Sequence, residues 1–356
     1  MKIVSVVGAR PQFVKLAPID RAARDAGCEH VIVHTGQHYD PMLSDVFFRD
    51  LGIAPPDVHL GVGSGTHGVQ TGAMLAALDG VFDEHRPDWV LVYGDTNSTA
   101  AAALSAVKMH LPVAHLEAGL RSFNRRMPEE HNRVVTDHVA DLLLAPTQRA
   151  VDHLAAEGLS ERTVLVGDVM TDVLYEVRDR VAGAAPALAR DLGLTPGEFY
   201  VATIHRADNT DDPGRLRDIT EALGGLDKPT LLLAHPRLVA KAAAHDIPLE
   251  RGSLVCRAPL SYPDLIAAAL ASAGVVTDSG GLQKEAFLLR VPCTTVRTET
   301  EWTETIDLGW NLLANTAAEI AEAVRRPAPA PTDAAPYGDG HAADRVIEVL
   351  ADQDPA

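Results

Sequence analysis

The chain has 356 residues, a length that exceeds the usual size of a single core and suggests two folded domains. With 46% hydrophobic and 22% charged residues, its composition excludes disordered and collagen-like architectures. The formal net charge of −18 is unfavourable for sequence-independent phosphate binding, so we expect no nucleic-acid partner. No apolar run reaches membrane-spanning length and residues 2–7 do not form a secretion signal, so we expect no membrane partner.

Short β-branched runs alternate with helix-like stretches from the first residue onward. They fall at residues 3–8, 31–36, 89–95, 113–117 and 142–146, and again at 200–205, 230–235, 254–257, 275–278 and 294–297. Because these runs are continuously apolar, they predict parallel strands in sheets that helices cover on both faces. We therefore predict an α/β protein made of two doubly wound halves.

An Ala/Gly/Pro stretch at residues 183–186 interrupts this rhythm and could be a linker. Near the end, proline-spaced residues 327–331 precede a last amphipathic helix. We predict a first domain over residues 1–170 and a second over residues 171–335, with a helix at 340–352 that packs back on the first domain. The alternative is that this helix only caps the second domain.

Two glycine-containing turns each follow a strand and open a helix. Gly8-Ala-Arg-Pro-Gln-Phe-Val-Lys15 offers free amides, an arginine and a lysine to an anion. Asp278-Ser-Gly-Gly-Leu-Gln-Lys-Glu285 can bind a phosphate through successive amides, and its last glutamate can accept from ribose hydroxyls. The alternatives are an ordinary strand-to-helix turn and a serine N-cap. One such turn in each half predicts a phosphate-bearing ligand in a cleft between the halves.

A third glycine pattern, Gly63-Ser-Gly-Thr-His-Gly68, matches the dinucleotide fingerprint letter by letter. The segment before it is broken by glycine, and the expected acid at the end of a second strand does not follow. We therefore expect a glycine-rich entry to a helix here and no nicotinamide cofactor.

Acidic residues gather where two neighbouring strands end. Val90-Leu-Val-Tyr-Gly-Asp95 ends one strand in a carboxylate, and His115-Leu-Glu-Ala-Gly-Leu-Arg121 places a glutamate just beyond the next strand. Met127-Pro-Glu-Glu-His-Asn-Arg133 adds further acids and an arginine, for which a surface pair between residues 129 and 133 is the default explanation. Parallel strands bring such residues to one rim, where open α/β sheets bind ligands.

Histidines follow two strands of the second half. Thr203-Ile-His-Arg-Ala-Asp208 places His205 and Arg206 at the end of its first strand, where a histidine beside an arginine favours a functional role over a structural one. His235-Pro-Arg237 repeats this arrangement one strand later.

The fifteen histidines raise the question of a metal. The His-x-Glu of zinc deaminases occurs at residues 115–117, but its Pro-Cys-x-x-Cys partner is missing and no His-Glu-x-x-His occurs, so we expect no catalytic metal. Cys28, Cys256 and Cys293 form no Cys-x-x-Cys pair, which predicts reduced thiols in a cytoplasmic protein.

Eight motifs occur along the chain in a fixed order. They are Gly8-Ala-Arg-Pro-Gln12, Thr35-Gly-Gln-His38, Tyr93-Gly-Asp-Thr-Asn97, the two segments at residues 115–121 and 127–133, His205-Arg206, Asp278-Ser-Gly-Gly281 and Thr300-Glu-Trp302. Together they resemble the non-hydrolysing UDP-N-acetylglucosamine 2-epimerases over nearly the whole chain. The resemblance implies a glycosyltransferase-B-like (GT-B-like) fold of two Rossmann-like domains facing a central cleft, a homodimer, and interconversion of UDP-GlcNAc and UDP-ManNAc without metal or nicotinamide.

The resemblance also assigns residues. It implies four catalytic residues, which are Asp95, Glu117, Glu129 and His205. It implies substrate binding by residues around the sugar, the phosphates and the nucleotide, which are Arg10, Lys15, Arg133, His235, Ser279, Gly280, Gly281, Glu285 and Arg297.

These residue types fit the chemistry that the resemblance implies. C2 of a nucleotide sugar has no adjacent carbonyl, so a carboxylate cannot remove its hydrogen directly. Expelling UDP from C1 acidifies that hydrogen and leaves 2-acetamidoglucal. Protonation of the opposite face and return of UDP complete the inversion. This route needs acids or bases on both faces and donors that hold a diphosphate leaving group.

The sequence departs from the family pattern where many members bind a second, activating UDP-GlcNAc. Asp40 stands where a glutamine is common, and residues 63–66 lack an arginine, while Gln37 and Arg206 remain as possible regulatory residues. Lys284 and Trp302 also differ from the common choices and are typical of a branch that includes epimerases of diacetamido-uronic acid sugars.

We therefore predict a UDP-GlcNAc 2-epimerase. Three alternatives are considered, which are the same reaction on a modified UDP-2-acetamido sugar, a glycosyltransferase of the same fold, and a catalytically silent UDP-sugar sensor.

Overall fold

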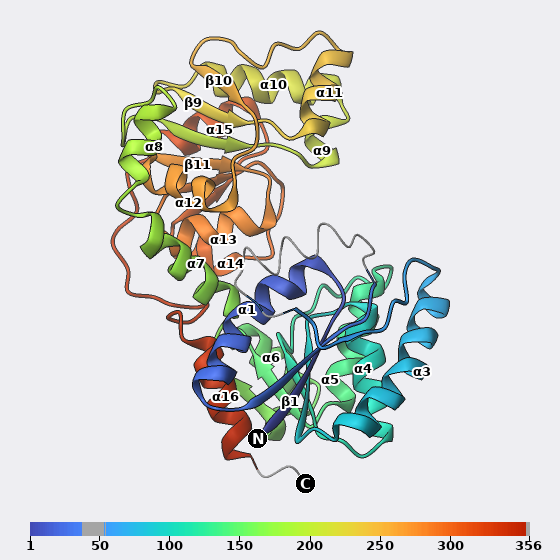
Figure 1. Cartoon of the computed structure of the whole chain (residues 1–356). Coiled ribbons are helices and arrows are strands. Elements are labelled where there is room, and N and C mark those ends of the chain that lie inside the picture. Colours follow the sequence, from blue (N-terminus) through green and yellow to red (C-terminus); the bar gives the residue numbers. More distant parts are fainter. Residues whose placement is uncertain (38–52, 54, 354–356) are drawn as a thin grey trace. The chain divides into compact units, whose positions relative to one another are not determined.

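The structure is a computed structural model, and it describes the chain except for residues 38–52, 54 and 354–356 (Figure 1). Its contacts divide the chain into two units. Unit 1 comprises Met1–Val173 and Ala335–Ala356, and unit 2 comprises Leu174–Ala334. The boundary lies inside helix α7 (Val169–Val181), and residues 183–186, interpreted above as a possible linker, span the end of the turn after α7 and the first two residues of α8 (Ala185–Asp191).

Unit 1 contains a seven-stranded parallel sheet in the order β3-β2-β1-β4-β5-β6-β7. Its strands are β1 (Lys2–Val7), β2 (Glu29–His34), β3 (Val58–His59), β4 (Trp89–Tyr93), β5 (Val113–Leu116), β6 (Leu142–Ala145) and β7 (Thr163–Leu165). Besides α7 its helices are α1 (Arg10–Asp25), α3 (His67–His85), α4 (Asn97–Lys108), α5 (Pro128–Val139), α6 (Gln148–Ala156), the 3-10 turn η1 (Ser160–Arg162) and α16 (Ala342–Asp352). The strand order reverses between β1 and β4, and this switch point is where such sheets bind ligands.

The core of unit 1 has two layers because successive residues of a strand face opposite sides of the sheet. Ile3 joins a cluster with residues of α1 and α16, whereas Val4 joins a cluster with residues of α3 and α4. The last helix completes the first of these layers. It lies beside α1 (Figure 1), and Trp89 donates its indole N–H to Leu350 O at 3.1 Å.

Unit 2 repeats this architecture with a six-stranded parallel sheet in the order β10-β9-β8-β11-β12-β13. Its strands are β8 (Tyr200–Thr203), β9 (Thr230–Leu233), β10 (Leu254–Arg257), β11 (Gly274–Thr277), β12 (Cys293–Thr295) and β13 (Asn311–Leu313). Besides α8 its helices are α9 (Ala207–Thr210), α10 (Pro213–Gly224), α11 (Pro236–Ala244), α12 (Tyr262–Ala271), α13 (Gly280–Leu288), α14 (Thr303–Asp307) and α15 (Ala317–Val324). Its switch point lies between β8 and β11.

These sheets confirm the predicted fold class of two doubly wound parallel sheets. All ten predicted strands occur, and three further strands, β3, β7 and β13, were missed. Each of the three is only two or three residues long and lies at the edge of its sheet.

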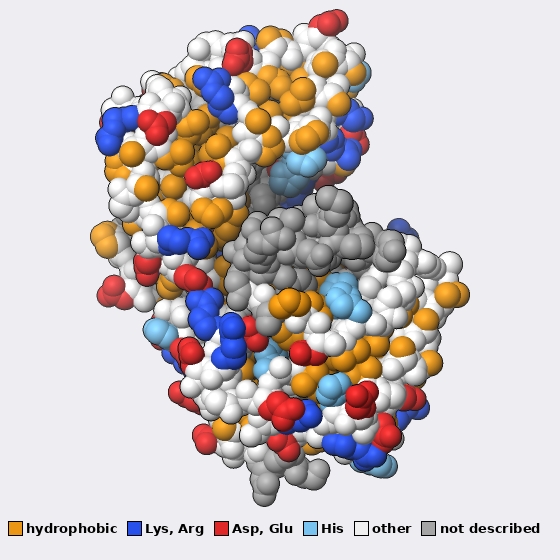
Figure 2. All heavy atoms as spheres, in the orientation of Figure 1, with side chains coloured by type: hydrophobic (Ala, Val, Ile, Leu, Met, Phe, Trp, Pro, Cys, Tyr) orange, Lys and Arg blue, Asp and Glu red, His pale blue; other side chains and the backbone are white. Residues whose placement is uncertain are grey.

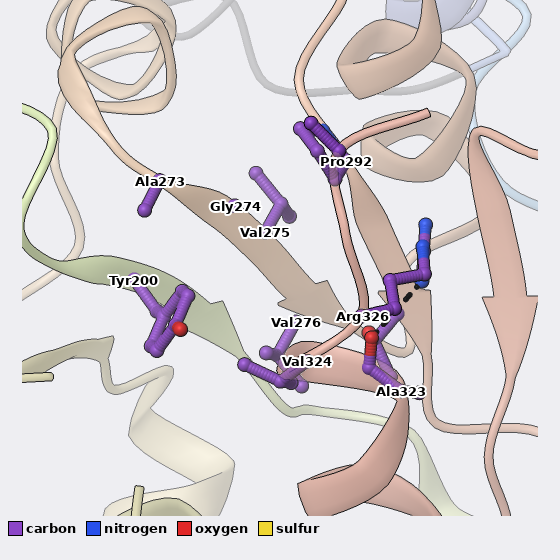
Figure 3. Close-up of a pocket in the computed structure, with 11 residues that line it drawn as sticks. Tyr200, Ala273, Gly274, Val275, Val276, Pro292, Ala323, Val324 and Arg326 are labelled. Atoms are coloured by element: carbon purple, nitrogen blue, oxygen red, sulfur yellow. Dashed lines mark hydrogen bonds between the residues drawn. The ribbon is translucent and has the colours of Figure 1, made fainter. Parts of the chain in front are cut away.

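The amino ends of the unit 2 strands border a small pocket (Figure 3). Tyr200 and Gly274, the first residues of β8 and β11, line it together with Arg326. The Arg326 guanidinium donates to the carbonyls of Cys293 and Trp310, at 2.9 Å each. Because the first residues of β8 and β11 line this pocket, it lies at the opposite end of the sheet from the predicted site, and none of the predicted site residues lines it.

The visible surface carries no large area of a single charge sign. In Figure 2, basic and acidic side chains are interspersed on the face shown. Within the part of the chain that the structure describes, no helix combines the length and the hydropathy needed to cross a bilayer.

Candidate active site

The two candidate acids of unit 1 leave neighbouring strands at matching positions. Tyr93 of β4 pairs with Leu116 of β5, so Asp95 and Glu117 both begin just beyond this pair at the carboxyl end of the sheet. Gly94, which directly precedes Asp95, has φ +60°. A Cβ at Gly94 would lie 3.1 Å from Glu117 Oε2 and 3.4 Å from Lys15 Nζ, so the backbone that carries one acid passes directly beside the side chain of the other.

Glu117 forms an ion pair with Lys15 of α1 through its Oε2 atom. The two side chains are 19% and 13% exposed, so little water screens the pair. Burial alone would lower the pKa of Lys15, but Glu117 first, then Asp168 and Asp95, raise that pKa above its usual value. Glu117 also has φ +74°, a left-handed conformation that costs a residue with a Cβ and is found at functional sites.

Asp95 forms an ion pair with Arg133 of α5. The same guanidinium donates from Nη1 to Glu130 Oε2 at 2.8 Å. The side-chain amide of Asn132 donates to Asp95 O at 3.0 Å, so α5 fixes both the backbone and the carboxylate of Asp95. The structure therefore brings Lys15, Arg133 and the two acids together in unit 1, whereas the strand pattern in the sequence predicted a common rim for the two acids.

The two glutamates of α5 have different surroundings. Glu129 is exposed and makes no hydrogen bond or ion pair with the described residues. Glu130 is buried and accepts from Ser122 N at 2.9 Å and Phe123 N at 2.8 Å. Burial would raise the pKa of Glu130, but the bonds from Ser122 and Phe123 and the charge of Arg133 lower it. Arg133 thus pairs with Glu130 and Asp95, not with the residue four positions before it.

The turn after β1 is closed by Gln12. Its Oε1 accepts from Gly8 N at 2.8 Å and Ala9 N at 3.0 Å, and its Nε2 donates to Tyr93 O at 2.8 Å. The sequence suggested that these amides are free for an anion, whereas Gln12 uses both of them to join the ends of β1 and β4. Arg10 begins α1, and its side chain lies outside what the structure describes.

Asp278 organises the switch point of unit 2. Its carboxylate is fully buried and accepts from His205 N at 3.0 Å and Arg206 N at 2.9 Å. The His205 Nδ1 atom lies 3.3 Å from Asp278 Oδ1, and its side chain is 41% exposed. The rings of His205 and His235 lie 6.0 Å apart. His235 caps α11, since its Nδ1 accepts from Arg237 N at 3.2 Å.

The predicted phosphate turn follows β11, which pairs with β8, and leads into α13. It therefore lies beside the strand that His205 follows. Ser279 is the N-cap, and its hydroxyl accepts from Leu282 N at 3.4 Å. A Cβ at Gly280 would lie 2.5 Å from Glu301 Oε1, whereas a Cβ at Gly281 would meet nothing within 4 Å. Glu301 is in turn paired with Arg297 at 2.8 Å.

Glu285 of α13 accepts a hydrogen bond from the Tyr262 hydroxyl at 2.9 Å. Burial raises the pKa of Glu285 above its usual value, although the bond from Tyr262 and the charge of Lys284 lower it.

The two possible regulatory residues lie in different units. Gln37 of unit 1 accepts through Oε1 from Ser98 N at 3.0 Å and Ser98 Oγ at 2.7 Å, next to the start of α4. Arg206 of unit 2 lines a pocket with Arg215 and Arg297. Asp40 lies outside the described residues.

Two other sequence observations have structural counterparts. Residues 63–66 lead into α3, whose N-cap is Thr66, so this glycine pattern is an entry to a helix that follows an edge strand. No group of three or more His, Cys, Asp or Glu residues that could hold a metal occurs among the described residues.

Sequence reasoning missed a buried cluster directly below the unit 1 acids. It consists of His115, Asp137 and Arg121, and Asp137 was not singled out because its partners are 22 and 16 residues away along the chain. Only the period of α5 hints at it, since residues 130, 133 and 137 share one face of that helix.

Comparisons with known proteins cover almost the whole chain. The model of a family described as UDP-N-acetylglucosamine 2-epimerase matches residues 20–351. A UDP-2,3-diacetamido-2,3-dideoxy-D-glucuronate 2-epimerase from Pseudomonas aeruginosa is 43% identical over 361 residues, with 99% of each chain covered.

Solved structures give the same picture. The structure of UDP-GlcNAc 2-epimerase from Methanocaldococcus jannaschii aligns with a TM-score of 0.87 at 33% identity, covering 99% of each chain. A crystal structure of the enzyme from that organism in complex with UDP-GlcNAc and UDP aligns with a TM-score of 0.78 at 34% identity, again covering 99% of each chain.

Proposed function

The chain belongs to the UDP-N-acetylglucosamine 2-epimerase family, and we propose that it inverts C2 of a UDP-2-acetamido sugar by expelling UDP from C1 and adding it back. Membership confirms the predicted family, makes the chain an epimerase, and confirms the GT-B-like α/β fold class. UDP-GlcNAc and its C2 epimer UDP-ManNAc are the substrate pair that we propose first, because the family description and the M. jannaschii structures name UDP-GlcNAc.

The observation that carries the proposal is the pair of acids that follow β4 and β5, beside the unit 1 switch point. Asp95 and Glu117 leave paired strands, and each is held by a cation from another element. Loss of UDP makes C1 electron-deficient and the C2 hydrogen acidic, so one acid has to remove that hydrogen and another has to protonate the opposite face. Lys15 of α1 holds Glu117 and Arg133 of α5 holds Asp95, so the two acids are fixed independently. This arrangement suits a reaction that needs an acid or base on each face of the sugar ring.

We assign the remaining catalytic roles in the same way. Glu129, exposed at the start of α5, is a third acid available to the substrate. Lys15 and Arg133 hold the acids and contact sugar and phosphate oxygens once substrate is bound. His205 stabilises the departing diphosphate, since its ring is partly exposed and its backbone is fixed by the buried Asp278.

Unit 2 is assigned to the nucleotide. The amides of Ser279, Gly280 and Gly281 at the start of α13 are suited to phosphate oxygens, because a helix N-terminus offers N–H groups and a positive dipole end. Glu285 is assigned to the ribose hydroxyls. Arg297, His235 and Arg10 are assigned to the substrate as well.

Isotope exchange tests the proposal directly. Incubation with UDP-GlcNAc in deuterium oxide should place deuterium at C2 in both epimers, because the proton that returns comes from solvent. The epimers should end between about even and ten to one, as a free-energy gap of about 0 to 1.4 kcal/mol gives. A C2 hydrogen that stays protium while UDP-ManNAc accumulates, or no conversion of any UDP-2-acetamido sugar, would refute the proposal.

A second candidate substrate is favoured by two observations. The P. aeruginosa relative is named for a diacetamido-uronate, and the Lys284 and Trp302 side chains that mark this sequence branch lie together, with Lys284 Nζ 4.5 Å from the Trp302 ring centroid. The same reaction on UDP-2,3-diacetamido-glucuronate is therefore the alternative. A substrate panel decides, because the true substrate should have the higher kcat/KM.

Two finer expectations complete the proposal. We propose a cytoplasmic protein because all three cysteines are free thiols, and a homodimer because the family resemblance implies one. Cell fractionation tests the first, and light scattering of the purified chain tests the second. Sugar transfer to an added acceptor would instead support the glycosyltransferase alternative, and tight UDP-sugar binding without exchange would support the sensor.

A further inference from the structure

A fully buried ionic cluster lies below the two acids of unit 1. The side chains of His115, Asp137 and Arg121 are no more than 1% exposed. Asp137 Oδ1 lies 2.6 Å from His115 Nδ1, and Asp137 Oδ2 lies 2.6 Å from Arg121 Nη1. Arg121 also bonds Glu157 through Nε at 2.7 Å and Nη2 at 2.8 Å. Charges are seldom buried so completely unless they are paired and hydrogen-bonded.

Both ring nitrogens of His115 face hydrogen-bond acceptors. Its Nδ1 faces the Asp137 carboxylate, and its Nε2 faces the carbonyl of Gly94 at 2.7 Å. Neither partner carries a proton to donate, so both contacts are hydrogen bonds only when both ring nitrogens carry hydrogen. Burial raises the pKa of Asp137, but His115 and then Arg121 outweigh it and lower that pKa below its usual value.

The cluster forms hydrogen bonds with the backbone close to each of the two candidate acids. His115 binds the carbonyl of Gly94, the residue directly before Asp95. Asp137 accepts from Gly119 N at 3.1 Å, two residues after Glu117. Gly94 has φ +60° and Gly119 has φ +83°, so both turns are sharp and lie where small shifts move a catalytic side chain.

Close packing restricts the backbone conformation of the turn that carries Glu117. A Cβ at Gly119 would lie 2.4 Å from Ala150 O, so the backbone there is against α6. Glu117 itself is left-handed, and its amide donates to Leu144 O at 3.1 Å. Strained conformations persist where the surroundings fix them firmly, and the buried cluster supplies part of that support.

We propose that His115, held in its charged form by Asp137, is a positioning residue that sets the separation of Asp95 and Glu117. The inference rests on the proposed function, because it gives those two acids their catalytic role. His115 does not touch the substrate. It acts through the Gly94 carbonyl, and Asp137 extends the same constraint to the turn that carries Glu117.

Unit 1 contains a matched control. His30 and Asp20 form a second buried pair, with Nδ1 2.9 Å from Oδ1 and side chains 2% and 4% exposed. The second ring nitrogen of His30 contacts Ser5 Oγ at 2.8 Å. His30 pairs with Ile3 near the amino ends of the strands, the end opposite to the acids. Loss of this pair changes a similar buried interaction, whose link toward the candidate site is the bond between Ser5 Oγ and the Tyr93 hydroxyl at 2.8 Å and not a bond to the backbone beside an acid.

The test compares His115→Gln with His30→Gln in the full-length protein. For His115→Gln we expect kcat to fall about 100-fold, the effect of a displacement of about 1 Å of a catalytic group, while KM and the Kd for UDP change by less than about threefold. For His30→Gln we expect kcat to stay within about threefold of wild type at a comparable loss of Tm. Equal losses of kcat in the two variants, or an equal loss of UDP affinity and kcat in His115→Gln, would overturn the inference.

A second variant and a measurement on the wild type keep the inference testable if His115→Gln fails to fold. Asp137→Asn keeps the side-chain shape but removes the charge that holds the imidazolium, so kcat should again fall with UDP affinity unchanged. In wild-type protein labelled with 15N-histidine, one buried ring should show two protonated nitrogens with slow solvent exchange and a coupling to the Gly94 carbonyl. A neutral ring at that position contradicts the inference.

The two proposals fail in distinguishable ways. A wild-type protein that exchanges no C2 hydrogen removes the proposed function. An active wild type in which His115→Gln behaves like His30→Gln removes only the role of His115.

Discussion

Unit 1 and unit 2 share a doubly wound topology, and both place their predicted residues where the strand order reverses, yet they fill that place with different chemistry. In unit 1, Asp95 and Glu117 are side-chain acids held by Arg133 and Lys15. In unit 2, the buried Asp278 binds backbone N–H groups, and the surface beside it is a glycine turn with partly exposed histidines.

The shared topology places residues at the same end of each sheet, and the side chains found there determine which chemistry that end supports. Paired acids and cations suit proton transfer, whereas amides at a helix start suit a bound phosphate. We therefore expect substitutions at the unit 1 acids to lower kcat and substitutions in the unit 2 glycine turn to weaken nucleotide binding.

Replacing Asp95 by Asn should abolish most turnover. We expect kcat to fall about 1000-fold, because general acid–base catalysis contributes on that scale, while UDP affinity changes by less than about twofold. Deuterium wash-in followed by NMR measures the first effect, and calorimetry with UDP measures the second. Asp25→Asn, an exposed change at the end of α1, is the control and should behave as wild type. Unchanged turnover would remove Asp95 from the mechanism.

Gly94→Ala should come next. The added Cβ meets Glu117 Oε2 at 3.1 Å in a left-handed position, so one of the two acids has to move. We expect kcat to fall about 10- to 100-fold with little change in UDP affinity. Gly72→Ala, on the exposed face of α3 with nothing within 4 Å, should instead stabilise the fold by about 0.5–1 kcal/mol. A loss of UDP affinity in Gly94→Ala that exceeds its loss of kcat would contradict the assignment of this turn to catalysis.

In unit 2, Gly280→Ala should weaken the Kd for UDP about tenfold, equivalent to about 1.4 kcal/mol. Its Cβ would meet Glu301 Oε1 at 2.5 Å and would stand where the turn approaches a phosphate. Gly183→Ala adds a methyl group in open space in the same unit and serves as the control. At saturating substrate, kcat of Gly280→Ala should approach the wild-type value, and a kcat loss as large as the affinity loss would contradict the assignment of this turn to nucleotide binding.

The smallest effect concerns stability and pH. Burial raises the pKa of Glu285, so the folded state binds that proton more tightly than the unfolded state does. Its stabilising contribution is complete below the ordinary value of 4.5 and is lost as the pH rises through the folded-state pKa. The stability of Glu285→Gln relative to wild type should therefore increase with pH in denaturant titrations. A difference that is flat or falls with pH would show that the carboxyl is not held in its neutral form.

Much of the fold was predictable because each long buried strand is a continuous apolar run. The three strands that were missed, including β3 and β13, are too short for such a signal and exist because a neighbouring strand offers free hydrogen bonds. Helix α7 likewise crosses from one unit to the other without any change in composition at residues 173–174.

For the candidate site, sequence placed Asp95 and Glu117 at one rim because strand ends are readable. It did not reveal which cation holds which acid, nor that Glu130 rather than Glu129 is buried, since both depend on how the loop at residues 121–127 folds over α5. The pair of His115 and Asp137 depends on contacts between β5 and α5, which no local pattern encodes.

The central claim is that the bond between C1 of the sugar and its diphosphate oxygen breaks and re-forms during inversion. UDP-GlcNAc labelled with 18O in that bridging position tests it most directly, because released UDP can rotate before it returns. With wild-type protein we expect 18O to move into non-bridging positions of the β-phosphate at a rate at least equal to the formation of UDP-ManNAc. Inversion at C2 with all of the label still in the bridging position would contradict it.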